Sequence, residues 1–161
     1  MHKLPGFALS VVWTCLLLSL RGSVRGEELA KLRTATGIDS GVAVVIADDA
    51  SLATDLASEG AFVVHLLTSN ERHVAPLREA VAKMRLGGRI VVGEMPGDGA
   101  LPYPDRLLNL VAGDLTMLEQ AARPSQRELQ RVLAVRGLAY VKVDESDEWK
   151  TLAPQGTQDL D

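Results

Sequence analysis

The sequence has little cysteine and few aromatic residues. Cys15 is the only cysteine among 161 residues, and it lies inside an apolar N-terminal run. The rest of the chain therefore has neither a disulfide nor a thiol nucleophile. Aromatic residues make up 4% of the chain and hydrophobic residues 47%. We expect one domain plus appendages, with a sizeable core of aliphatic side chains and alanine.

The sequence also lacks a run of basic residues. Its formal charge is −4, which argues against nucleic-acid binding through a phosphate-neutralising patch. It shows no Ser–His–Asp order with a nucleophile-elbow turn, no cluster of zinc ligands and no internal repeat. These absences argue against a serine hydrolase of that type, a zinc protein and a repeat protein.

Residues 1–26 have the pattern of an export signal. Lys3 supplies a positive start, an apolar run of 14 residues spans 7–20, and Gly26 precedes Glu27 at a suitable cleavage point. The run is shorter than the roughly 20 apolar residues that a membrane-spanning helix needs. The sequence therefore predicts an exported protein, periplasmic or extracellular. The alternative is an uncleaved segment that anchors the N-terminus in a membrane.

Cleavage after residue 26 makes the remaining chain more acidic. It removes Lys3, Arg21 and Arg25 from the 17 basic residues, which leaves 14 against 21 acidic residues, a formal charge of −7.

Apolar strands alternate with helices between residues 27 and 143. Strands are expected over 41–46, 61–67, 89–93, 107–112 and 138–143, and helices over 27–36, 51–58, 70–86, 116–122 and 126–136. This order predicts an α/β domain with a doubly wound, Rossmann-like and mostly parallel sheet of about five strands. Residues 144–161 are expected to form a polar tail or linker.

The last of these helices has a strong start signal. Ser125 is expected to cap the backbone amide of Glu128, and the Glu128 side chain is expected to reach back to Ser125. Gly137 is expected to end the helix.

Asp48, Asp49 and Ala50 occupy the turn between the first strand and the helix over 51–58. A strand, a tight turn and a helix form the unit with which α/β domains hold nucleotide-like cofactors. The glycines expected in such a turn are absent.

The order of elements and three segments resemble class I S-adenosylmethionine-dependent methyltransferases. The segments are 44–53 at the family's glycine-rich loop, 101–111 around the fourth strand, and 129–138 before the fifth. The resemblance covers about residues 27–143 and implies S-adenosylmethionine as cofactor.

The sequence departs from this family at the cofactor loop and at the ribose contact. Family glycines let the backbone approach the methionine portion of the cofactor, whereas Asp48 and Ala50 place β-carbons there. Asp49 matches a position that is often polar. The family's acid at the end of strand two binds both ribose hydroxyls, but here that position is Thr68, which offers a single oxygen.

Other positions matched to the family follow later strands. Glu94 or Asp98 could meet the adenine amino group, and the spacing does not decide between them. Asp114 matches a substrate-side position. The family's C-terminal antiparallel hairpin is missing, so one sheet edge is open or covered by the tail.

Residues 149–154 resemble the linker of secreted bacterial proteins that join a methyltransferase-like domain to a quinoprotein-type β-propeller. The resemblance implies a β-propeller domain or protein as partner, and a chain that is a truncated N-terminal part.

Each candidate residue also has a structural interpretation. We favour Asp48 as the N-cap of the helix over 51–58, with a cation site at Asp48 and Asp49 as a weaker alternative. Asp114 is expected to cap the next helix. His65 is expected to be a hydrogen-bonded core residue, His73 to be solvated, and Asn109 to be structural.

The sequence supports three functions. We favour a degenerate methyltransferase-like domain that serves as an exported binding or docking module. The second is an active methyltransferase whose divergent loop contacts the cofactor through Asp49, Thr68 and Glu94. The third is an unrelated small-ligand-binding α/β domain that uses the strand ends around Asp48 and Thr68.

Overall fold

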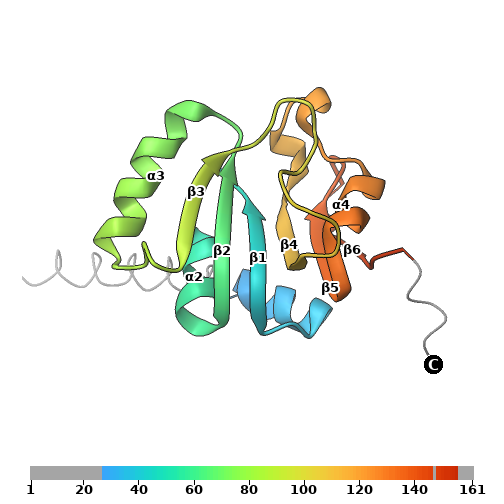
Figure 1. Cartoon of the computed structure of the whole chain (residues 1–161), viewed down its shortest axis with the longest axis horizontal. Helices are drawn as coiled ribbons and strands as arrows, with labels where there is room; N and C mark the ends of the chain where they lie inside the picture. The colour runs from blue at the N-terminus through green and yellow to red at the C-terminus, as the bar shows by residue number, and fades with distance from the viewer. Residues whose placement is uncertain (1–26, 147, 156–161) are drawn as a thin grey trace, which may run out of the picture.

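A computed structural model describes residues 27–146 and 148–155, which form an α/β domain around one six-stranded sheet (Figure 1). The strands are β1 (Ser40–Ile46), β2 (Ala61–Thr68), β3 (Ile90–Glu94), β4 (Leu108–Asp114), β5 (Leu133–Lys142) and β6 (Lys150–Leu152), in the order β3-β2-β1-β4-β5-β6. Strands β1 to β5 are parallel, and β6 is antiparallel to β5. The doubly wound, mostly parallel sheet expected from the sequence is confirmed.

Both faces of the sheet are covered, although by different kinds of segment. Helical residues 27–36, α2 (Ser51–Glu59) and α3 (Glu71–Lys83) pack on one face. Loop 95–107, two 3₁₀ turns and α4 (Gln126–Val132) pack on the other. Side chains of β1 alternate between the two cores, which explains why this strand is apolar throughout.

Helix α4 is shorter than the sequence suggests. It ends at Val132, and Gly137 lies inside β5 instead of ending the helix. A β-carbon at Gly137 would lie 2.4 Å from the backbone oxygen of Leu108, next to a register shift between β4 and β5. The prediction that Gly137 stops the helix is therefore wrong, because this glycine serves a close approach of two strands.

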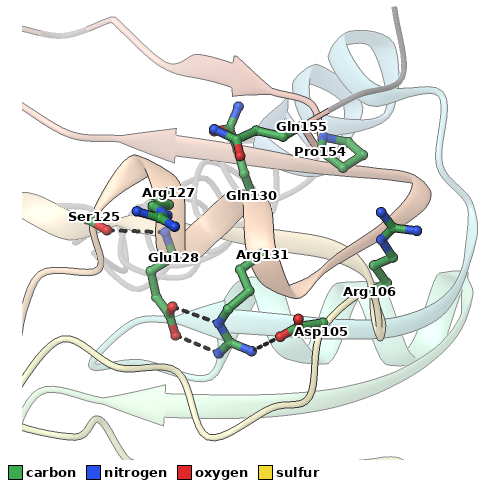
Figure 2. Close-up of a pocket in the computed structure, with 9 residues that line it drawn as sticks. All are labelled: Asp105, Arg106, Ser125, Arg127, Glu128, Gln130, Arg131, Pro154 and Gln155. Carbon is green, nitrogen blue, oxygen red and sulfur yellow. Dashed lines mark hydrogen bonds and ion pairs between the residues drawn. The ribbon is translucent and has the colours of Figure 1, made fainter. Parts of the chain in front are cut away.

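The capping prediction for α4 is half right. Ser125 Oγ accepts a hydrogen bond from the Glu128 backbone amide, as expected. The Glu128 carboxylate does not reach back to Ser125. It accepts from the Leu101 backbone amide at 2.8 Å and pairs with Arg131 (Figure 2).

Arg131 joins α4 to loop 95–107. Its guanidinium donates to the backbone oxygens of Leu101 at 3.2 Å and Tyr103 at 2.9 Å, and it also pairs with Asp105. Since this loop contains no helix, these bonds hold it against the sheet face that it covers.

The segment between β4 and α4 contains two 3₁₀ turns, η1 (Leu115–Met117) and η2 (Gln120–Ala122), where one helix over 116–122 was expected. The Arg123 side chain donates to the backbone oxygens of Thr116 and Leu118. It thereby satisfies carbonyl groups that a continuous helix would have bonded internally.

The segment expected to be a polar tail contributes the strand β6. Trp149 stacks on Tyr140 of β5, with ring centroids 4.9 Å apart and an angle of 13° between the planes. The edge of β5 is therefore covered by one short antiparallel strand. The predicted signal, residues 1–26, lies outside the described residues, and within the described part no helix is long and apolar enough to cross a membrane.

Candidate functional site

The candidate residues follow four neighbouring strands at one edge of the sheet. Asp48 comes after β1, Thr68 and Glu94 end β2 and β3, and Asp114 ends β4. Because the strands are parallel, these residues lie at the carboxyl edge, where open α/β sheets bind ligands. Of this set, hydrogen bonding brings Asp48 and Thr68 together.

The Asp48 carboxylate bridges the ends of β1 and β2. Its Oδ1 accepts from Thr68 Oγ1 at 2.5 Å and from the Ser69 backbone amide at 2.9 Å. The Ser69 hydroxyl donates to both carboxylate oxygens, and His73 Nδ1 lies 3.2 Å from Oδ1. We call these four residues the Asp48 network.

The network keeps Asp48 ionised. Burial of the carboxylate by itself raises its pKa, but hydrogen bonds from Thr68 and Ser69 outweigh burial and lower the pKa of Asp48 to about 2. The carboxylate is therefore charged at neutral pH, and its oxygens are engaged within the protein.

Asp48 does not cap α2, so that interpretation is wrong. Ala50 occupies the N-cap position without a side-chain hydrogen bond. Asp49 instead accepts from the Ser51 backbone amide at 2.7 Å and from the Ser51 hydroxyl. The Asp48 side chain points towards the end of β2, because the Thr68 hydroxyl and the Ser69 backbone amide donate hydrogen bonds to it there.

Thr68 and His73 are both part of this arrangement. Thr68 is fully buried, and its hydroxyl donates to Asp48 while lying 3.3 Å from His73 Nδ1. The prediction that His73 is solvated is confirmed, since its side chain is 46% exposed, and its ring also contacts the Asp48 carboxylate. Ser69 and His73 were missed as partners. Their position just after β2 and in the first turn of α3 is the signal that could have identified them.

A cavity of about 380 Å³ lies beside this network at the carboxyl edge. Its lining residues come from the segments after β2, β3 and β4, and are Ser69, Asn70, Glu94, Met95, Gly97, Met117, Leu118, Glu119 and Ala122. Glu94 lines the cavity. Asp98 is absent from the lining and accepts a hydrogen bond from the Ala100 backbone amide at 3.0 Å.

The remaining candidates are held by local contacts. Asp114 accepts from the backbone amide and the hydroxyl of Thr116, which confirms that it caps the next turn, η1. Asn109 Oδ1 accepts from the Val42 backbone amide at 2.9 Å, which confirms a structural role. No group of three or more potential metal ligands lies together in residues 27–146 and 148–155.

His65 is hydrogen-bonded, as predicted, but its side chain is half-buried instead of lying in the core. Its Nδ1 lies 2.6 Å from the hydroxyl oxygen of Tyr103, and the two rings meet edge to face. Burial lowers the pKa of His65 and raises that of Tyr103. Both groups are therefore neutral at physiological pH, and the pair ties loop 95–107 to β2.

Solved structures with the same fold are methyltransferases or share their architecture. A protein from Methanococcus maripaludis, described as an S-adenosyl-L-methionine-dependent methyltransferase, matches with a TM-score of 0.61 at 20% sequence identity. The match covers 70% of this chain and 52% of the M. maripaludis chain. The [4+2]-cyclase SpnF matches with a TM-score of 0.60 at 23% sequence identity, over 71% of this chain and 43% of the SpnF chain. A SAM-dependent methyltransferase from Aquifex aeolicus matches with a TM-score of 0.54 at 19% identity, over 74% and 66%.

These likenesses establish the fold. The chain has the Rossmann-like fold of the S-adenosylmethionine-dependent methyltransferases, and it spans about half the length of the first two structures. No protein-family model and no curated protein matches the sequence. Because a cyclase shares the fold, the fold alone does not assign a reaction.

Proposed function

We propose that the protein is a degenerate methyltransferase-like domain that acts as an exported binding or docking module. The observation that carries this proposal is the hydrogen bond from the buried Thr68 hydroxyl to Asp48. It engages the two side chains at the ends of β1 and β2, where the methyltransferase resemblance expects a cofactor loop and a ribose contact.

Several features of the Asp48 network oppose cofactor binding. Asp48 and Ala50 carry β-carbons where the methyltransferase resemblance expects glycines. Thr68 has no second oxygen for a diol, and its single oxygen already contacts two protein groups. A ligand in this space would have to break hydrogen bonds to a charged carboxylate, each worth about 1.5–3 kcal/mol.

Export and a partner belong to the same proposal. They rest on the signal pattern of residues 1–26 and on the likeness of residues 149–154 to a linker before a β-propeller. An exported domain would meet little S-adenosylmethionine, which is made in the cytoplasm. A β-propeller protein or domain is the partner we propose.

Calorimetric titration of the purified, folded chain with S-adenosylmethionine and S-adenosylhomocysteine tests the proposal. We expect no saturable heat with either compound. A dissociation constant in the micromolar range, which corresponds to a binding free energy of about −8 kcal/mol, would contradict the proposed loss of cofactor binding. An active methyltransferase of the same fold, titrated with the same ligand stocks, is the positive control.

A second candidate is a ligand-binding function, with or without methyl transfer. The 380 Å³ cavity beside Glu94 favours it, because ligand sites in such sheets lie at this edge. The double variant Asp48→Gly/Ala50→Gly tests whether side chains in the loop exclude the cofactor. If the affinity for S-adenosylmethionine rises in this double variant but not in the control variant Ala47→Gly, the side chains at positions 48 and 50 exclude the cofactor sterically. An unchanged affinity for S-adenosylmethionine in the double variant would reject steric exclusion.

A further inference from the structure

A second cavity, of about 390 Å³, lies along α4 and is here called the α4 groove (Figure 2). Its lining residues come from α4, the loop before β4 and the segment after β6, and are Asp105, Arg106, Ser125, Arg127, Glu128, Gln130, Arg131, Pro154 and Gln155. Asp105 and Arg106 precede β4, so this part of the groove lies towards the amino edge of the sheet. The Asp48 network lies at the opposite, carboxyl edge.

Arg131 pairs with both carboxylates of the groove, so these three groups together carry a formal charge of −1. Arg131 lies 2.7 Å from the Glu128 carboxylate and 2.6 Å from the Asp105 carboxylate (Figure 2). The pKa of Glu128 is lowered, chiefly by its hydrogen bond from Arg131. These three groups have a structural role and offer little to a ligand.

The other two arginines remain available. Within residues 27–146 and 148–155, neither the Arg106 nor the Arg127 side chain forms an ion pair or a hydrogen bond. With three arginines against two carboxylates, the groove lining has a formal charge of +1 on a chain whose charge is −4. An anionic partner would meet two guanidinium groups that pair with no carboxylate of the described residues.

The two free arginines come from different segments, Arg127 from α4 and Arg106 from the loop before β4. Arg127, Gln130 and Arg131 share one face of α4, because they are three and four residues apart. The Arg106 backbone amide donates to the Arg131 oxygen at 2.9 Å, which places Arg106 near the end of α4. Figure 2 shows Arg127 and Arg106 on opposite sides of Gln130.

The remaining lining suits a peptide backbone. Gln130 Nε2 donates to the Ala153 oxygen at 3.0 Å and so holds Pro154 and Gln155 against α4. The proline ring supplies an apolar wall, and the amide of Gln155 can donate to or accept from a main chain.

We propose that the α4 groove binds an extended acidic peptide segment of a partner protein. In an extended chain, side chains two residues apart point to the same side, so two acidic side chains can face the groove together. Guanidinium groups bind carboxylates through charge-assisted hydrogen bonds. This inference rests on the proposed docking function and specifies the chemistry of the partner.

Titration of the ¹⁵N-labelled full chain with acetyl-Gly-Asp-Ser-Asp-Gly-amide tests the groove. We expect saturable shifts confined to α4, Arg106 and residues 153–155, and binding that weakens at high salt. The Arg106→Ala/Arg127→Ala variant should bind at least fivefold more weakly. The same peptide with asparagine in place of aspartate should not bind.

Arg72→Ala/Arg85→Ala is the matched control variant. Arg72 is the second residue of α3, as Arg127 is of α4, and Arg85 has a φ of 59° where Arg106 has 60°. We expect this variant to bind the acidic peptide within twofold of wild type. Equal weakening in both variants would overturn the proposal, because it would show unspecific attraction.

Two further outcomes would overturn the inference. One is the absence of saturable binding, and the other is equal binding of the asparagine peptide. Calorimetry with S-adenosylmethionine reports separately on the proposed function. A chain that binds neither the cofactor nor the peptide would reject the groove and leave docking through another surface. A chain that binds the cofactor would reject the docking function itself.

Discussion

At the scale of single residues, Asp48 couples the stability of the fold to pH. Its pKa is lowered from an ordinary value of 3.8 to about 2. The stabilisation is therefore complete above about pH 4 and is lost as the pH falls towards 2. Since the side chain is 35% exposed, we discount the effect to about 1 kcal/mol.

Asp48→Asn should remove this pH dependence. The free energy of unfolding is measured by urea denaturation at pH 5 and at pH 2. We expect the decrease between these two pH values to be about 1 kcal/mol smaller in the variant than in wild type. Asp98→Asn is the control, because among the described residues the Asp98 side chain bonds to the nearby Ala100 amide alone, and this variant should keep the wild-type profile. Identical profiles for Asp48→Asn and wild type would contradict the role of the network.

The Asp48 network also shows how far sequence analysis reaches at this scale. The sequence predicts the strands closely enough that Asp48, Thr68, Glu94 and Asp114 fall at or just after the predicted strand ends. The direction of the Asp48 side chain was predicted wrongly. The capping preference is a rule about neighbours in sequence, whereas Thr68 lies 20 residues away, and only the fold brings the two together.

At the scale of elements, Gly137 controls how closely β5 approaches β4. Gly137→Ala should lower the free energy of unfolding by about 1–3 kcal/mol, because the new methyl group meets the Leu108 backbone oxygen. Chemical denaturation measures the change. Gly87→Ala has open space around it and should stay within about 0.5 kcal/mol of wild type. Equal effects of the two substitutions would contradict this account.

Arg131 is the element-scale link between α4 and loop 95–107. Arg131→Met should lower the free energy of unfolding by about 2 kcal/mol, since the Leu101 and Tyr103 oxygens lose their donor. Hydrogen exchange at the Leu101 amide, which bonds to Glu128, should become faster.

Arg131→Lys separates charge from geometry in the same experiment. Lysine keeps the positive charge but cannot reproduce the planar fork that reaches two carboxylates and two carbonyl groups. We expect Arg131→Lys to lower the free energy of unfolding, but by less than Arg131→Met does. Full retention of stability in this variant would show that charge alone suffices.

The elements themselves differed in how well they could be predicted. The long apolar runs of β1 and β2 identify buried strands clearly. The 3₁₀ turns η1 and η2 were expected as one helix, because the same residue types serve both. Gly137 was misread because a glycine beside a helix is a common stop signal, and its contact with β4 is tertiary.

At the scale of the whole molecule, β6 covers one edge of the sheet. Thr151→Pro should remove it from the sheet, since proline, with its fixed φ and no amide hydrogen, disfavours the middle position of a strand of three residues. The uncovered edge of β5 should then promote self-association. Light scattering over a range of concentrations measures this, and Thr151→Val, which keeps the strand, should match wild type. A monomeric proline variant would contradict the role of β6.

The topology of the whole sheet was predictable except at this edge. Alternating strands and helices predict parallel pairing through right-handed connections, and the observed order follows. Strand β6 was missed because its three residues are too few for an alternating pattern to register. Its position depends on the Trp149 stack with Tyr140, which forms only once the domain has folded.

The bridge between the ends of β1 and β2 makes the effects of substitutions there epistatic. Glycine at position 48 alone frees the loop but leaves the buried Thr68 hydroxyl without the carboxylate to which it donates. An acid at position 68 alone places a second negative charge beside Asp48. Each single step towards a conventional cofactor site therefore costs stability before the pair of changes can compensate. The order in which substitutions arise decides which sequences this fold can reach.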